Sequence, residues 1–236
     1  SEDKGHGSEE TAAELYEAFL KNEIVAYLTD DSVSDIKNMV VGGSYTIEQI
    51  SEKLGISFSN NEYIDCGSDG IKELVCYFSD PYGSACIAVK EKNGKLCIIY
   101  IGPTGVGATG SGIGESSINQ KGFVSSEIYA GSGIYTYGYI NAEGLYQEWF
   151  TLGWEFPMLF DDEDMPDILP EYRVGDKTFC VCEDTLRRSA YEKAGLMICT
   201  SSEIKRLIED RRIEIGLDTE IVGDEPVYGR NGTVEF

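Results

Sequence analysis

The chain has 236 residues, of which 42 are acidic and 19 are basic, and its formal net charge is −23. That length suits one well-buried core or two small lobes, since domains typically contain ~100–200 residues. A surface of this sign repels phosphate backbones and anionic headgroups, so we expect no nucleic acid partner, while cations, basic proteins and neutral glycans remain. No run approaches the ~18 apolar residues of a membrane helix, and no transmembrane segment is predicted.

Residues 1–10 (SEDKGHGSEE) are predicted to be a polar tether, and they lack the apolar stretch of a signal peptide. Either the protein is intracellular, or a leader has been removed and Ser1 begins the mature form. A helix is predicted over residues 11–28, because Thr11 and Glu14 have capping-box spacing and apolar residues follow at helical intervals. A shorter helix should follow Thr46 and end at Gly55.

From Glu62 to about Phe156 the pattern changes to strands. Asn93-Gly94 lies between two apolar runs and strongly indicates a hairpin, and residues 141–144 (NAEG) indicate a longer turn. Successive hairpins imply an antiparallel meander of about six or seven strands, packed by the N-terminal helix. The predicted fold class is therefore α+β, with a smaller helical C-terminal region.

An acidic, proline-containing loop over residues 157–171 is the best candidate boundary. Beyond it we expect a short strand, a helix over residues 184–194, and a second helix opened by a capping box at Thr200 and Glu203. The predicted organisation is a tether at 1–10, a helix plus antiparallel sheet at 11–156, and an acidic loop with an α/β region at 157–236. One continuous domain is the alternative.

Several catalytic and cofactor chemistries find little support in the sequence. The single histidine, His6, lies in the polar N-terminal segment, which argues against Ser-His-Asp, Cys-His and histidine–zinc sites. The seven cysteines form no CxxC pair, so we expect buried thiols, with a strained Cys180–Cys182 redox pair as the alternative. The GxGxxG run at residues 105–110 lacks the helix that dinucleotide binding requires, and reads as a loop over a sheet edge or site. We predict no catalytic residue and no organic cofactor.

One acidic turn between two apolar strands, residues 65–74, is a degenerate copy of DxNxDGxxEL. Asp65, Asp69 and Glu73 occupy the first, fifth and ninth positions of a calcium loop, and Ile71 could supply a carbonyl. Gly67 stands at the third position and Cys76 at the twelfth, which excludes a true EF-hand. Calcium binding at Asp65, Asp69, Ile71 and Glu73 is one hypothesis. The other is a structural turn whose carboxylates accept backbone amides.

The chain resembles uncharacterised secreted or lipid-anchored bacterial proteins in three segments, which are this turn, residues 13–20 (AELYEAFL) and the tyrosine-rich run at 134–144. The resemblance covers about residues 12–150. It implies an extracytoplasmic location after leader removal and carries no enzymatic activity with it. Gly67 and Lys72 depart from the pattern.

Aromatic residues are densest after residue 129, where Tyr135, Tyr137 and Tyr139 alternate with other residues and would project from one face of a strand, with Trp149 nearby. A solvent-facing stripe would bind a glycan or a peptide by stacking. Alternatively, the rings pack across strands or beneath a helix. We predict a non-enzymatic extracytoplasmic binding or structural module that uses this face. The competing hypothesis is a glycan hydrolase with two carboxylates ~5–10 Å apart.

Overall fold

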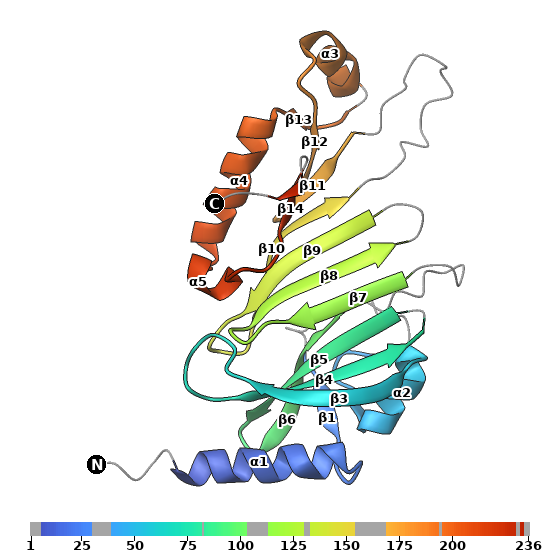
Figure 1. The fold of residues 1–236 in the computed structure, drawn as a ribbon, viewed down its shortest axis with the longest axis vertical. Coiled ribbons are helices and arrows are strands. Elements are labelled where there is room, and N and C mark those ends of the chain that lie inside the picture. The colour runs from blue at the N-terminus through green and yellow to red at the C-terminus, as the bar shows by residue number, and fades with distance from the viewer. Residues whose placement is uncertain are drawn as a thin grey trace.

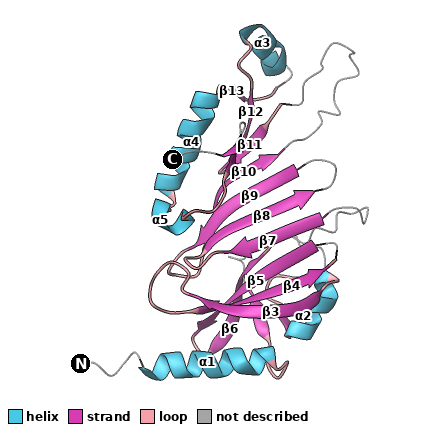
Figure 2. Cartoon of the chain, in the orientation of Figure 1, coloured by secondary structure: helices cyan, strands magenta, loops and turns pink. Residues whose placement is uncertain are grey.

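A computed structural model describes residues 6–29, 39–81, 83–102, 113–129, 133–153, 169–193, 195–229 and 232–233. It confirms the α+β class, with strands predominating (Figures 1 and 2). The strands form two large sheets and a small two-stranded one, whereas the sequence led us to expect a single meander. The GxGxxG run at 105–110 and most of the acidic loop at 157–171 lie outside the described residues.

The first large sheet has six strands, in the order β2-β1-β6-β5-β4-β3. Strands β3 to β6 are joined antiparallel in sequence order, and β1 pairs parallel to β6. The predicted Asn93-Gly94 hairpin connects β5 to β6, and both residues have positive φ, +56° and +78°, as a type I′ turn requires. The bounds are β1 Ala26–Leu28, β2 Ser44–Tyr45, β3 Ser57–Ile64, β4 Glu73–Asp80, β5 Gly83–Lys92 and β6 Lys95–Ile101.

The second sheet has seven strands, in the order β13-β12-β11-β10-β9-β8-β7. Strands on both sides of residue 156 belong to it, so the predicted boundary there does not separate two sheets. The bounds are β7 Ile113–Ile118, β8 Phe123–Tyr129, β9 Gly133–Ile140, β10 Tyr146–Gly153, β11 Glu171–Val174, β12 Lys177–Val181 and β13 Ile198–Cys199. A small sheet pairs β14 (Tyr228–Gly229) with β15 (Gly232–Thr233).

The five described helices are α1 His6–Leu20, α2 Ile47–Leu54, α3 Thr185–Lys193, α4 Ser201–Glu214 and α5 Thr219–Val222. The predicted bounds of the first helix were wrong: α1 begins inside the expected tether and ends at Leu20, where Asn22 turns the chain with a φ of +64°. The capping box at Thr200 and the end of α2 at Gly55, in the left-handed region, are confirmed, and α2 follows Thr46 as expected; the structure adds a capping box between Thr46 and Gln49.

The core divides into clusters that follow the alternation of the strands. One face of the six-stranded sheet packs with Tyr16 and Phe19 of α1 and with Ile50 of α2. Its other face packs against the seven-stranded sheet, where Tyr100 and Tyr146 bring their ring centroids within 5.0 Å. The far face of the seven-stranded sheet is covered by α4, which lies along it in Figure 1. The central strands of both sheets are therefore covered on two faces, whereas the edge strand β3 is mostly exposed.

Strands β5 and β7 meet where the two sheets join. A Cβ on Gly83 would lie 2.8 Å from the carbonyl oxygen of Gly114, and one on Gly102 would lie 2.0 Å from Ser116 Oγ. The amide of Cys86 donates to Ser116 Oγ at 2.9 Å. This close approach needs glycine at the start of β5 and just after β6, and it brings β7 and β8 together with the start of β5.

Candidate functional site

A polar pocket of about 290 Å³, called the serine pocket here, opens beside this junction. Its walls come from β5, β7, β8 and β9 and from the segment that leads into β14. Five serines, three carboxylates and three tyrosines dominate the lining, and none of its described residues is a lysine or arginine. The serines are Ser84, Ser116, Ser117, Ser125 and Ser126; the carboxylates are Glu115, Glu127 and Glu225; and the tyrosines are Tyr135, Tyr137 and Tyr228.

The register of β7 and β8 builds this pocket from two mirrored tripeptides. Residues 115–117 read ESS and residues 125–127 read SSE, so an antiparallel hairpin places like residues opposite each other. Ser117 and Ser125 hydrogen-bond through their hydroxyls at 2.9 Å, and Glu115 pairs with Glu127. We did not predict this site from the sequence, although the mirrored tripeptides are a visible signal for it.

Glu127 carries the least satisfied oxygen in the described structure. Its Oε1 is buried and accepts no hydrogen bond from the described residues. Tyr135 hydrogen-bonds to the same side chain, and burial together with that bond and the nearby negative charge raises the pKa of Tyr135 well above its ordinary value. Because like charges directly opposite each other destabilise a sheet, the Glu115–Glu127 pair would gain from a donor or a cation in the pocket.

The predicted solvent-facing aromatic stripe is wrong for three of its four residues. Tyr137, Tyr139 and Trp149 are 1%, 5% and 0% exposed. Trp149 Nε1 donates to the carbonyl of Ile208 at 2.9 Å, and the Tyr139 hydroxyl donates to the carbonyl of Ile215, so both rings lie under α4. The three tyrosines project from one face of β9 as expected, but a helix covers that face, which is the alternative arrangement.

Tyr135 is the one half-buried member of that stripe. Its ring centroid lies 4.9 Å from that of Tyr228, and the Tyr228 amide donates to the Tyr137 hydroxyl at 3.2 Å. The predicted tyrosine site is therefore reduced to Tyr135 and the hydroxyl end of Tyr137, both at the serine pocket.

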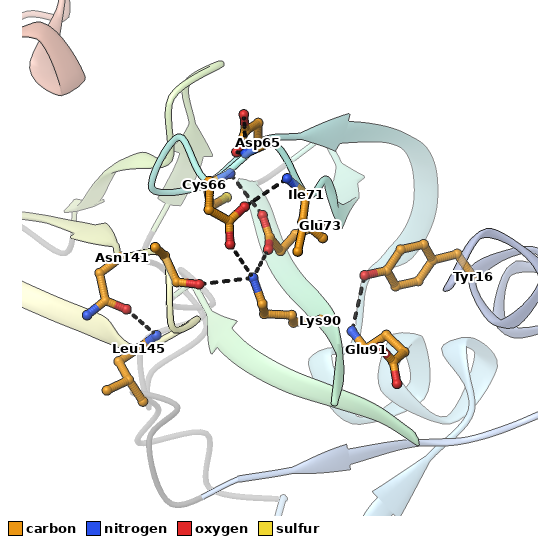
Figure 3. Close-up of polar contacts among 12 residues, drawn as sticks. Tyr16, Asp65, Cys66, Ile71, Glu73, Lys90, Glu91, Asn141 and Leu145 are labelled. Atoms are coloured by element: carbon orange, nitrogen blue, oxygen red, sulfur yellow. Dashed lines mark hydrogen bonds and ion pairs between the residues drawn. The ribbon is translucent and has the colours of Figure 1, made fainter. Parts of the chain in front are cut away.

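The acidic turn has the hydrogen bonds of a structural turn. Asp65 accepts the Gly70 amide at 3.1 and 3.2 Å, Asp69 Oδ1 accepts the Ile71 amide at 2.8 Å, and Glu73 Oε2 accepts the Cys66 amide at 2.8 Å (Figure 3). The carboxylates thus satisfy the backbone of their own turn.

The remaining carboxylate oxygens face an ammonium group. Lys90 Nζ forms an ion pair with fully buried Glu73, lies 3.5 Å from Asp69 Oδ2, and donates to the carbonyl of Ala142 at 3.2 Å (Figure 3). Burial lowers the pKa of Lys90, but the hydrogen bond and charge of Glu73 outweigh it, so the pKa lies above its ordinary value. Lys90 thus supplies the positive charge that calcium would bring.

The four predicted metal ligands, Asp65, Asp69, Ile71 and Glu73, do not fit a bound divalent ion in this arrangement. Their carboxylates are committed to amides and to Lys90, and the described residues contain no group of three His, Cys, Asp or Glu side chains suited to a metal. Calcium binding at this turn stays a prediction.

The cysteines lack the properties of nucleophiles. All seven are free, six are buried and Cys97 is partly exposed. Burial is the main cause that raises the pKa of Cys86 to about 12 and those of Cys180 and Cys199 to about 11. Cys180 and Cys182 form no disulfide and lie in a small apolar cluster. The thiols therefore behave as small apolar groups, as expected.

No family model, curated protein or solved structure matches this chain. Among the described helices, none is long and apolar enough to cross a membrane. We therefore infer the function from the geometry of the serine pocket and from the chemistry of its lining.

Proposed function

We propose that the protein is a non-enzymatic extracytoplasmic binding module whose serine pocket holds a small hydroxylated ligand, such as the end of a glycan. The observation that carries this proposal is the buried Oε1 of Glu127, which accepts no hydrogen bond from any residue that the structure describes and lies beside a row of serine hydroxyls. A buried acceptor without a partner costs free energy that a ligand hydroxyl would recover.

The lining favours a sugar over an apolar molecule. Serine hydroxyls can donate or accept, carboxylates accept from sugar hydroxyls, and the Tyr135–Tyr228 pair offers ring surface. The volume of about 290 Å³ lies just below the ~300–1,000 Å³ typical of small-molecule sites, which suits a small ligand. Among the described residues that line the pocket none is basic, which argues against phosphorylated or acidic ligands.

Calorimetric titration with a panel of neutral and amino sugars and short peptides tests the proposal. We expect Glu127→Gln to weaken the binding of the best ligand about tenfold, because the amide has one acceptor oxygen where the carboxylate offers two, one to the Tyr135 hydroxyl and one to the ligand. The same substitution relieves repulsion from Glu115, so the unfolding temperature should rise while binding weakens. Glu143→Gln, at an exposed hairpin turn, is the matched control. A panel without binding, or equal affinity in Glu127→Gln, would contradict the proposal.

A carboxylate-dependent glycan hydrolase is the second candidate, and the pairing of Glu115 with Glu127 favours it. Directly opposed residues have Cβ atoms ~4.5–5.5 Å apart, and retaining glycosidases hold their carboxyl groups ~5–5.5 Å apart. Turnover of aryl glycosides that is lost in both Glu115→Gln and Glu127→Gln, with sugar binding retained, would establish this function. Binding without turnover would support the binding module.

The extracytoplasmic location belongs to the same proposal and rests on the resemblance of the acidic turn to secreted and lipid-anchored proteins.

The proposal also retains the N-terminal helix as a packing element of the antiparallel meander, supported by the burial of Tyr16 and Phe19 against the six-stranded sheet.

A further inference from the structure

A second pocket, of about 560 Å³, lies between α1, the acidic turn and the end of β5, and is called the helix pocket here. Unlike the serine pocket, it is lined mostly by apolar surface, from Ala12, Ala13 and Tyr16 of α1, Tyr63 of β3, and Ile71 of the turn. Tyr63 and Ile71 are 36% and 45% exposed, which is high for large apolar side chains. Its volume is typical of a small-molecule site, ~300–1,000 Å³.

The charged groups around the helix pocket differ in whether they already have hydrogen-bond or ion-pair partners among the described residues. Glu17 lies 3.9 Å from Lys21 and hydrogen-bonds to Tyr63, and Glu91 accepts the Gly94 amide. Lys90 is committed to the acidic turn. Lys72 is exposed at the pocket and forms no ion pair with any described side chain. Of the two lysines that line the pocket, Lys72 is therefore the one whose ammonium is available to a ligand anion, on a protein with a net charge of −23.

A hydroxyl provides a second polar group in the pocket. Tyr16 accepts the Glu91 amide at 3.1 Å, an arrangement visible in Figure 3. Because the oxygen is used as an acceptor, its own proton is oriented elsewhere and can be donated to a ligand oxygen. Apolar walls with one cation and one hydroxyl donor match a molecule that has an apolar body and an anionic, oxygen-bearing head.

We propose that the helix pocket binds a free single-chain carboxylate of the fatty-acid class. Its chain would lie against the alanines of α1 and the rings of Tyr16 and Tyr63, and its carboxylate would meet Lys72. A membrane is the less suitable source of such a group, because the strongly acidic surface is repelled by anionic bilayers. This site is separate from the serine pocket and does not depend on the function proposed there.

Titration calorimetry of the whole chain with octanoate, decanoate and dodecanoate below their micelle concentrations tests the proposal. Each added methylene should tighten binding about fourfold until the pocket is full. Decanol and decyltrimethylammonium should bind about tenfold more weakly than decanoate, because they lack a charge that Lys72 attracts. No binding of decanoate, or tighter binding of the cationic amphiphile, would overturn the proposal.

Two pairs of variants locate the site. Lys72→Gln should reduce decanoate affinity to that of decanol, whereas Lys177→Gln on β12 should leave it unchanged. Ala13→Phe should abolish binding by filling the pocket from an exposed helical position, whereas Glu14→Phe, one residue along α1, should not. Circular dichroism establishes that each variant is folded. Decanoate binding that survives Ala13→Phe, or sedimentation of the protein with anionic vesicles in place of free carboxylate binding, would overturn the assignment.

Discussion

Gly67 shows how a single residue decides the chemistry of the acidic turn. A Cβ at this position would lie 2.2 Å from the Ala142 amide nitrogen, and its φ is +79°. The turn is therefore seated against the β9–β10 hairpin so closely that a calcium-ligating side chain at the third position has no room. The ammonium of Lys90 bridges the same two segments by donating to Ala142.

Lys90→Met should destabilise the protein by about 3–5 kcal/mol, because it leaves fully buried Glu73 without its counter-charge. Replacing both partners, in Glu73→Leu with Lys90→Met, should cost less than the single change, since a buried ion pair is often replaceable by apolar residues. Urea unfolding measures both, with Lys177→Met as the exposed control. A Lys90→Met cost below about 1 kcal/mol, the range of surface pairs, would contradict the buried pair.

Millimolar calcium should leave the melting temperature of the unmodified protein unchanged, because Lys90 already neutralises the turn. Differential scanning calorimetry with and without the metal measures this. A rise in melting temperature that disappears in the double variant Asp65→Ala with Asp69→Ala would instead establish a calcium site at the turn.

At the scale of elements, capping residues define where α2 and α4 begin. In α4, Glu203 accepts the Thr200 amide at 2.8 Å, and Thr200 Oγ1 in turn accepts the Glu203 amide at 3.2 Å. These reciprocal bonds satisfy donors that the first turn of a helix would otherwise leave unpaired. They also place the helix that covers Tyr139 and Trp149.

The stability that Glu203 contributes should depend on pH. Hydrogen bonds from the backbone and the hydroxyl of Thr200 lower the pKa of Glu203 below its ordinary value of 4.5. A lowered pKa in the folded state means that the stabilisation is full above that ordinary value and is lost as the pH falls through the lowered pKa. Urea unfolding at pH 6 and pH 3 should therefore show a cost of Glu203→Gln only at pH 6. Glu52→Gln, exposed on α2, serves as control, and an equal cost at both pH values would contradict the cap.

At the scale of the whole molecule, tyrosines form the contacts between layers. Tyr100 and Tyr146 meet between the two sheets, Tyr137 and Tyr139 lie between the seven-stranded sheet and the C-terminal elements, and Tyr16 joins α1 to β5. Burial is the main cause that raises the pKa values of Tyr100, Tyr146 and Tyr137 well above 10. The folded state therefore excludes tyrosinate from these interfaces.

Alkaline titration should show this exclusion. Because the folded pKa values are raised, the stabilisation is complete below the unfolded value of about 10 and is lost as the pH rises toward the folded values. We expect a late absorbance step at 295 nm that coincides with loss of circular dichroism, and a single step near pH ~10 in guanidinium chloride. Complete ionisation near pH 10 with the circular dichroism retained would contradict this burial.

Features encoded within a few residues were predictable from the sequence. The Asn93-Gly94 hairpin, the capping box at Thr200, the start of α2 after Thr46, its end at Gly55 and the shared face of the β9 tyrosines all follow from local turn chemistry and strand alternation. Such signals depend on φ preferences and side-chain periodicity, which neighbouring residues determine.

Only the tertiary structure decided which of these local features face solvent and which meet each other. Lys90 reaches Glu73 and Ala142, which lie 17 and 52 residues away, and α4 covers the tyrosine face from the far end of the chain. The division into two sheets, the burial of Trp149 and the serine pocket are products of the same long-range packing. Sequence periodicity specifies that a face exists, but the burial of that face is set by the free energy of packing it against elements distant in the chain.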